Sequence, residues 1–148
     1  MSSSQQGITL EEAIEQLSLI ENQLKQLQAA AAELEARLLQ LSSLETALAD
    51  LRSGSDDALI PLDPKATAIV RGTIKPLDKV IVHAGSNIFV EVGYDKAVEV
   101  VRREKAEVSK TLDAYKQEIA KLSQYYAALR AAVEQAISSA QQTGQGRQ

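Results

Sequence analysis

The amino-acid sequence predicts an α+β protein, a long antiparallel α-helical coiled-coil hairpin with a four-strand insert of two β-hairpins. Three observations predict this fold. Apolar residues recur at heptad spacing in both halves of the chain, and a segment rich in β-branched residues separates the two heptad regions. Only 3% of the residues are aromatic, too few for an ordinary globular core. The length of 148 residues is typical of a single domain, 1–148.

The first helix is expected over residues 9–53. Thr9 and Glu12 have the spacing of a capping box, in which each side chain accepts a hydrogen bond from a backbone N–H. Apolar residues then alternate at steps of three and four, the pattern of a coiled-coil seam. The seam is interrupted at Glu45, where the leucines predict a shift in phase, and Gly54 is the expected C-cap. The seam residues are Leu10, Ala13, Leu17, Ile20, Leu24, Leu27, Ala31, Leu34, Leu38, Leu41 and Leu48.

The second helix is expected over 95–140, with Asp95 as the N-cap. Its seam has one charged member, Lys105, and the segment 141–148 is expected to be a flexible tail. The apolar seam residues are Val98, Val101, Val108, Leu112, Tyr115, Ile119, Leu122, Tyr126, Leu129, Val133, Ala136 and Ala140. Matching seams and a compact connector predict that the two helices pair with each other in antiparallel orientation.

Two registers of this pairing fit the sequence. One places Leu48 opposite Val98, and the other is shifted from it by one heptad. In the first register Glu45 and Lys105 lie about one helical turn apart. They either pair and help to fix the register, or extend separately into solvent.

Between the helices, residues 58–94 form the predicted β insert. The expected strands are 59–62, 67–74, 79–84 and 88–92, bounded by turn residues. A sheet this small is marginally stable alone and leaves strand edges unpaired, which predicts that the insert assembles with other subunits. The apolar residues expected in subunit contacts are Leu59, Ile60, Leu62, Ile69, Val70, Ile74, Val80, Ile81, Val82, Ile88, Phe89 and Val90.

The sequence offers no constellation for catalysis, a cofactor or a metal. The chain has no cysteine, and its one histidine, His83, lacks neighbours that would form a base–nucleophile pair. The net charge of −4 gives no overall electrostatic support to nucleic-acid binding. No signal peptide or membrane span is predicted, so we expect a cytoplasmic protein that is not an enzyme.

The insert resembles that of the α-class subunits of prefoldin, in its archaeal more than its eukaryotic form. The layout of helix, two hairpins and helix is similar along essentially the whole chain, and four strands rather than two distinguish the α class from the β class. His83 and Asn87 depart from the family pattern, where an acidic or small residue and a glycine are expected. The similar segments are Ile60–Leu62, Val70–Gly72, Asp78–Val82, Gly85–Glu91 and the residue Ala97.

The resemblance implies an ATP-independent chaperone, a hexamer of two α and four β subunits whose inserts form β-barrels. It further implies that non-native client proteins are held between the tips of the coiled coils and delivered to a group II chaperonin.

The tips themselves also suggest client binding, because they combine apolar residues with an alanine-rich helix end that should fray. Fraying would expose a surface that tolerates many partners. The alternatives are that these are merely weak coil ends, or that the protein is a structural scaffold or tether binding one specific folded partner. The residues expected at the tips are Ile8, Leu10, Ala13, Ile14, Leu17, Val133, Ala136, Ile137 and Ala140.

Overall fold

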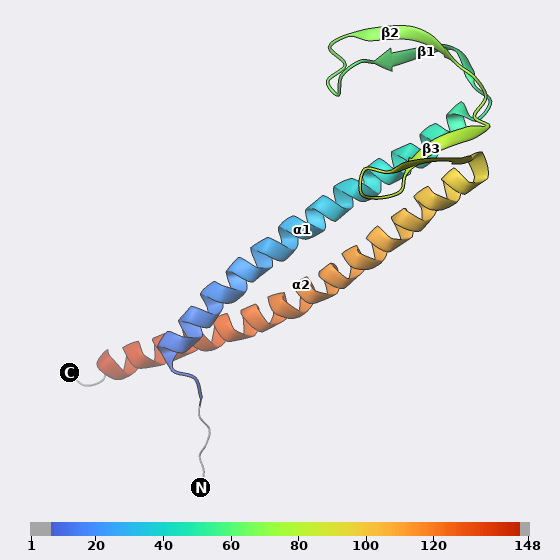
Figure 1. Ribbon diagram of the computed structural model, residues 1–148. Helices are drawn as coiled ribbons and strands as arrows, with labels where there is room; N and C mark the ends of the chain where they lie inside the picture. Colours follow the sequence, from blue (N-terminus) through green and yellow to red (C-terminus); the bar gives the residue numbers. More distant parts are fainter. Residues whose placement is uncertain (1–6, 146–148) are drawn as a thin grey trace. The chain divides into compact units, whose positions relative to one another are not determined.

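A computed structural model describes residues 7–145 of the chain. It consists of two long helices and four strands, and the strands lie between the helices in the sequence (Figure 1). The elements are α1 (Leu10–Leu51), β1 (Ser55–Pro61), β2 (Ile69–Ile74), β3 (Lys79–His83), β4 (Phe89–Gly93) and α2 (Tyr94–Gln145). This is the predicted α+β coiled-coil hairpin with an insert of two β-hairpins.

The described residues fall into two compact units, and both helices contribute to each. We call Glu35–Lys110 the insert unit, because it contains all four strands. The terminal unit comprises the described residues up to Leu34 and from Thr111 onward. Within each unit a segment of α1 lies beside a segment of α2 (Figure 1).

The capping predictions for α1 are confirmed. The Glu12 N–H donates to Thr9 Oγ1 and the Thr9 N–H donates to Glu12 Oε2, both at 3.1 Å. At the other end the helix stops at Leu51, two residues before the predicted end, and the Gly54 N–H donates to the Leu51 carbonyl over 2.8 Å. Gly54 has a φ of +82°, the left-handed conformation that favours glycine after a helix.

The helix α2 is longer than predicted. It begins at Tyr94 and continues to Gln145, so residues 141–145 are helical instead of forming the expected tail. Residues 146–148 lie outside the described part of the chain. Three of the five residues from 141 to 145 are glutamines, whose good helix propensity favours this extension.

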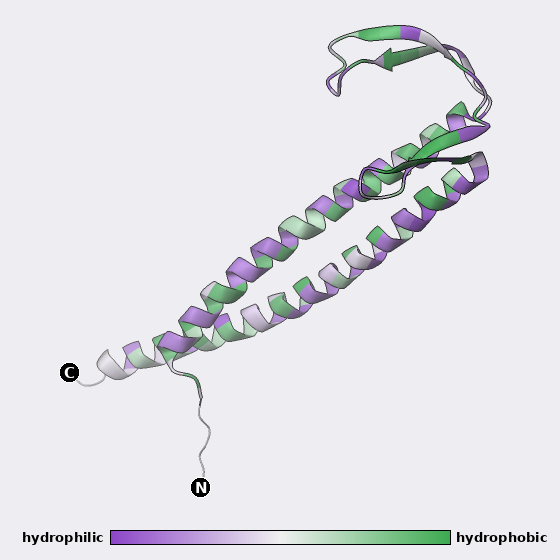
Figure 2. Cartoon of the chain, in the orientation of Figure 1, coloured by the Kyte–Doolittle hydropathy of each residue, from purple (hydrophilic) through white to green (hydrophobic). Residues whose placement is uncertain are grey.

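Burial confirms the seams of both helices. Apolar and polar residues alternate around each helix (Figure 2), and the predicted seam residues are buried or half-buried along almost their whole length. The exceptions lie near the helix ends, where Leu10, Ala136 and Ala140 are exposed.

The predicted phase shift at Glu45 is wrong. Leu44 is exposed, whereas Glu45 is half-buried in the seam and Leu48 is buried, so the heptad continues without a break. The Glu45 carboxylate reaches the seam edge and forms an ion pair with Arg102 at 3.7 Å. Its partner is therefore not Lys105, which is itself half-buried.

The contacts around Leu48 agree with the first of the two registers. Val98 packs against the buried cluster that contains Leu48. Glu45 reaches Arg102 on one side of this cluster, and the Arg52 guanidinium lies 4.6 Å from the centre of the Tyr94 ring on the other. A slip of one heptad would displace the helices by about 10 Å and separate these partners.

The four predicted strands are present, and they form two separate antiparallel hairpins. β1 pairs with β2 and β3 pairs with β4, and β1 begins at Ser55, four residues earlier than predicted. An irregularity in the register lies between Ser55 and Ala58. The turn after β3 contains Ser86 and Asn87 at φ +49° and +62°, which explains why asparagine can replace glycine there.

Candidate assembly and client-binding surfaces

The β1–β2 hairpin exposes apolar side chains on both faces. Successive strand residues point to opposite faces, and Leu59, Ile60, Ile69 and Val70 are all exposed. Leu62, in the turn that follows β1, is exposed as well. A two-stranded sheet with neither face covered is marginal in water, and contiguous exposed apolar surface is typical of interaction sites.

The β3–β4 hairpin has one partly covered face and one open face. Val80, Val82 and Val92 are half-buried. On the opposite face Ile81 is 65% exposed and Phe89 is 64% exposed. His83 pairs with Phe89 across the strands, with ring centroids 5.0 Å apart. The open face therefore combines the aliphatic and aromatic side chains of Ile81, His83 and Phe89 with an ion pair between Lys79 and Glu91 at 3.9 Å.

β3 lies against both helices and lines, together with them, a partly open cavity of about 230 Å³. The sequence analysis did not predict this contact between the helices and β3, although Ala97 is one of the residues that carry the family resemblance. Ala97 is fully buried although it is not a seam residue, and Leu44 and Val100 line the same cavity. The available signal was that Leu44 and Ala97 are apolar at positions that flank the seam.

The insert is attached to the helix ends by a cluster around Tyr94. The Tyr94 hydroxyl donates to the Leu48 carbonyl over 3.1 Å, and the Tyr94 N–H donates to the Asp78 carbonyl over 3.2 Å. Arg52 covers the Tyr94 ring, and its carbonyl accepts a hydrogen bond from the Leu77 N–H at 3.0 Å. These bonds link the end of α1, the start of α2 and the chain between the hairpins.

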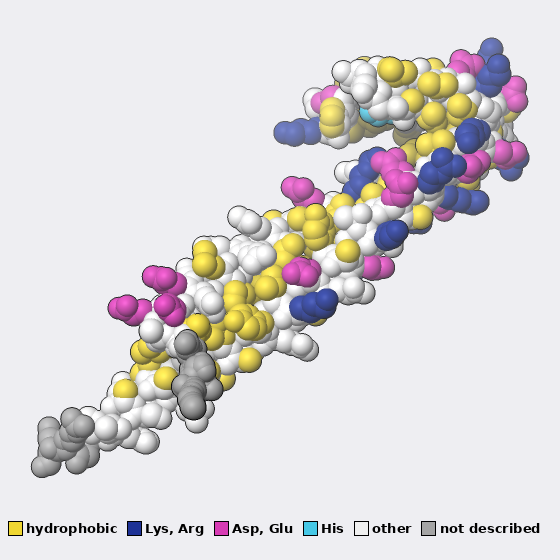
Figure 3. Space-filling model, turned by 60° about the horizontal axis from the view of Figure 1, so that its bottom comes forward, with side chains coloured by type: hydrophobic (Ala, Val, Ile, Leu, Met, Phe, Trp, Pro, Cys, Tyr) yellow, Lys and Arg dark blue, Asp and Glu magenta, His cyan; other side chains and the backbone are white. Residues whose placement is uncertain are grey.

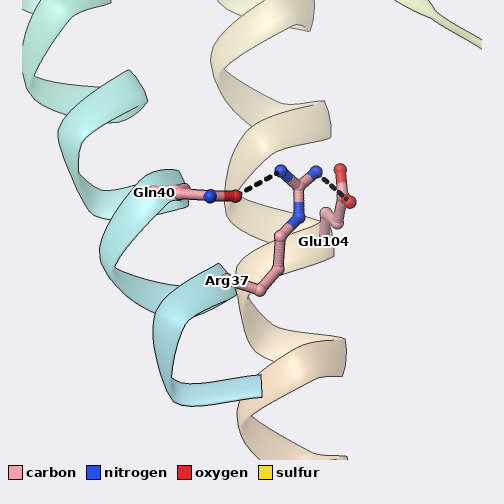
Figure 4. Close-up of polar contacts among 3 residues, drawn as sticks. All are labelled: Arg37, Gln40 and Glu104. Atoms are coloured by element: carbon pink, nitrogen blue, oxygen red, sulfur yellow. Dashed lines mark hydrogen bonds and ion pairs between the residues drawn. The ribbon is translucent and has the colours of Figure 1, made fainter. Parts of the chain in front are cut away.

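A charged contact joins the helices below the insert (Figure 4). Arg37 Nη2 lies 2.6 Å from Glu104 Oε1, and Arg37 Nη1 donates to Gln40 Oε1 over 3.4 Å. Both ion-pair side chains are about half exposed, so water screens their attraction. The geometry nevertheless favours the observed register, because a slip would part the two charges.

In the terminal unit, Ala13 of α1 and Val133 of α2 are the last buried seam residues before the helix ends. The remaining residues predicted for the tips are exposed except Leu17, which is half-buried. Figure 3 shows hydrophobic side chains over this unit and, separately, over the hairpins. The exposed tip residues are Ile8, Leu10, Ile14, Ala136, Ile137 and Ala140.

The pKa shift of Asp63 has a structural cause. Hydrogen bonds from the Thr67 hydroxyl at 2.7 Å and the Thr67 N–H at 2.6 Å lower the pKa of Asp63 below its ordinary value. This contact closes the turn between β1 and β2 and serves the fold. Among the described residues, no group of three or more potential ligands is placed to hold a metal ion. Neither helix contains, within its described residues, an apolar stretch long enough to cross a membrane.

Comparisons of the chain with known proteins agree on one family. The model of the family described as Prefoldin subunit matches residues 15–139. Prefoldin subunit alpha of Hyperthermus butylicus is 56% identical over 137 residues, covering 93% of this chain and 89% of the relative. Prefoldin subunit alpha of Aeropyrum pernix is 32% identical over 146 residues, covering 96% and 95%.

Among solved structures, filamentous PFD from Methanocaldococcus jannaschii is 26% identical, covering 82% of this chain and 95% of that chain, with a TM-score of 0.45. The family match and the two relatives span the helices and the insert alike. On this evidence the chain belongs to the prefoldin family and is similar to its α subunits along nearly its full length.

Proposed function

We propose that this chain is the α subunit of an ATP-independent holdase, a chaperone that binds non-native proteins and prevents their aggregation. The family is one of chaperone subunits, and its α members assemble with β subunits. The observation that carries the proposal is the distribution of exposed apolar surface. More than half of the large apolar side chains that are exposed lie in the two hairpins and their turns, and a further group, Ile8, Leu10, Ile14 and Ile137, lies at the ends of the helices in the terminal unit.

The hairpins support a role in assembly. Their exposed residues alternate with the half-buried ones along β3, and both faces of the β1–β2 hairpin are open. Strand edges and apolar faces of this kind are covered when equivalent strands of other subunits pair with them. We propose that two copies of this chain join four β subunits, and that the hairpins complete intersubunit β-barrels.

The ends of the helices support a role in client binding. Ala13 and Val133 are the buried seam residues there, and Ile8, Leu10, Ile14 and Ile137 are aliphatic residues that stay exposed around them. Such a surface attracts apolar segments of many sequences without requiring specific hydrogen bonds. We propose that clients are held there and then passed to a group II chaperonin in the cytoplasm.

The client-binding role is tested by aggregation assays with several unrelated denatured proteins. The assembled hexamer is expected to suppress aggregation at near-stoichiometric amounts, equally with and without ATP. A hexamer whose α subunits lack residues 1–17 and 133–148 should protect less well. If the trimmed hexamer protects clients equally well, the tips are not the binding site. Protection of no client, with tight binding of one native protein, would instead indicate a tether.

The assembly role is tested by mass measurement after co-expression with a β subunit. Co-expression of the intact chain with a β subunit is expected to yield a complex with the mass of the hexamer. Phe89→Asp should weaken assembly about tenfold or more, because it places a charge where the proposed assembly buries an aromatic ring. Lys75→Asp, at an exposed position between the hairpins, is the control. A chain that remains a stable monomer with every β subunit would contradict the assembly role.

A further inference from the structure

His83, the only histidine of the chain, lies on the open face of the β3–β4 hairpin. Its side chain is exposed, and its ring lies beside the ring of Phe89 across the strands, with 5.0 Å between the centroids and 49° between the planes. Ile81 lies two residues earlier on the same face and is also exposed. Ile81, His83 and Phe89 thus form one exposed patch, which we call the β3–β4 patch.

The charged groups around His83 are paired with each other. On the open face, Lys79 Nζ lies 3.9 Å from Glu91 Oε1. His83 also borders the cavity between β3 and the helices, and the charged residues in the lining of that cavity are Arg37 and Glu104, which form an ion pair at 2.6 Å. Each pair is neutral as a whole. Within residues 7–145, neither this face nor the cavity lining therefore offers the histidine a carboxylate without a cation of its own.

Histidine differs from the other ionisable side chains of the chain in the pH range where its charge changes. Free histidine titrates near pH 6.5, whereas carboxylic acids ordinarily titrate near pH 4 and lysine near pH 10. An exposed imidazole is therefore mostly neutral at about pH 7.5 and mostly charged at about pH 5.5. Between these two values the β3–β4 patch changes its charge, while the ion pairs around it keep theirs.

Assembly through the β3–β4 hairpin would bury this patch, and burial has different consequences for the two forms of the ring. A neutral imidazole is accommodated beside aromatic and aliphatic side chains, whereas an imidazolium loses its hydration without gaining a counter-charge from this chain. We propose that protonation of His83 is a switch that releases the β3–β4 patch from the other subunits. The inference rests on the proposed assembly role and adds a regulation of that same surface.

The direction of the pH dependence follows from linkage. The free chain exposes the imidazole and takes up a proton more readily than the assembled chain, in which the ring is covered. Assembly is therefore at full strength above about pH 6.5 and weakens as the pH falls below that value. Between about pH 7.5 and pH 5.5, the dissociation constant should rise about tenfold for each α subunit in the complex.

The switch is tested on the hexamer obtained by co-expression with a β subunit. Its dissociation on dilution is followed by analytical ultracentrifugation at about pH 7.5 and pH 5.5. His83→Gln, which is never charged, should assemble at both pH values and lose most of the tenfold change. His83→Lys, which is always charged, should assemble about as weakly at pH 7.5 as the unmodified chain does at pH 5.5. Circular dichroism at both pH values checks that each variant keeps its helices.

Three outcomes would overturn the inference. If the unmodified and His83→Gln hexamers weaken equally at pH 5.5, other groups carry the pH dependence. If His83→Lys assembles as tightly as the unmodified chain at pH 7.5, a charge at this position is tolerated. If the hexamer tightens at pH 5.5, a partner subunit supplies a carboxylate to the imidazolium. In each case a hexamer exists at pH 7.5 and the assembly role stands, whereas a chain that forms no complex at either pH would contradict the assembly role itself.

Discussion

The insert unit and the terminal unit are built from the same two helices but are stabilised differently. In the insert unit Leu41, Leu48 and Val101 form a buried cluster, and residues of the insert pack against it. In the terminal unit the buried side chains are Ala13, Ile20, Ala31, Leu112 and Val133, which lie in the seam between the two helices. The insert unit differs in that residues of the insert add a further layer to its seam.

The polar contacts between the helices show the same difference. In the insert unit, the contact between Arg37 and Glu104 carries opposite charges at 2.6 Å. In the terminal unit the Tyr125 hydroxyl donates to Gln16 Oε1 over 3.3 Å, a neutral and longer bond. A charged contact in the insert unit and a weaker, neutral one in the terminal unit agree with the proposed roles, in which the hairpins hold the subunit contacts and the tips adapt to different clients.

The largest expected effect comes from the insert unit's core. Leu41 is 1% exposed, so Leu41→Ala should lower the free energy of unfolding by about 2–5 kcal/mol. Leu24→Ala, at a half-buried seam position of the terminal unit, should cost less than half as much. Urea unfolding followed by circular dichroism measures both. Leu39→Ala is the control, because Leu39 is 72% exposed and its truncation should be nearly neutral. Equal costs for Leu41→Ala and Leu24→Ala would contradict the comparison.

The second prediction concerns Gly54, which connects α1 to the insert. At Gly54 an added Cβ would lie 2.6 Å from the Ile74 carbonyl oxygen, and φ is already left-handed. Gly54→Ala should therefore lower the free energy of unfolding by about 2–3 kcal/mol, more than the left-handed backbone conformation alone would cost. Gly85→Ala is the matched control, since Gly85 has a φ of +97° but nothing within 4 Å of its added Cβ. Its cost should be about 1–2 kcal/mol. Equal losses of stability for the two variants in thermal unfolding would show that the backbone near Gly54 moves to make room for the added Cβ.

The parts of the fold that sequence could predict are those set by local rules. The Thr9 capping box, the Gly54 cap and the heptad seams depend on residues a few positions apart, and all three are confirmed. The β-branched runs of the insert also identified all four strands. The family was recognisable from the insert for the same reason, because its turns and strands constrain residue types far more than a heptad does.

The parts that could not be predicted depend on contacts between distant segments. The burial of Ala97 follows from β3 lying against the helices, and its apolar character beside the seam does not identify β3 as the element that covers it. The seam continues through Glu45 because Arg102, 57 positions later in the numbering, supplies its counter-charge. Contacts with clients and other subunits lie outside a single chain altogether, so the roles assigned to the tips and hairpins remain proposals.

A smaller effect concerns the charged contact between the helices. In a double-mutant cycle of Arg37→Gln and Glu104→Gln, the coupling should be about 0.2–1 kcal/mol, since both side chains are about half exposed. It should fall as salt is raised from 0.05 to about 1 M. The corresponding cycle of Gln16→Ala and Tyr125→Phe in the terminal unit should show a coupling that salt leaves unchanged. A salt-dependent coupling in the second cycle would mean that charge stabilises both units alike.

The smallest effect lies in the turn between β1 and β2, which must hold that hairpin before any subunit covers it. Thr67 lowers the pKa of Asp63, so the contact stabilises the turn above the ordinary pKa of aspartate, about 3.9, and the stabilisation is lost as the pH falls through the lowered value. Titration of the Asp63 carboxyl carbon by NMR should give a pKa below the ordinary one. Thr67→Val should raise that pKa by removing the hydroxyl donor, whereas Thr67→Ser should keep it low. Asp63→Asn should increase hydrogen exchange at the Thr67 N–H near pH 7 but have little effect below the lowered pKa. If Thr67→Val leaves the pKa of Asp63 unchanged, the hydroxyl does not stabilise the carboxylate, and the hairpin depends on its backbone hydrogen bonds alone.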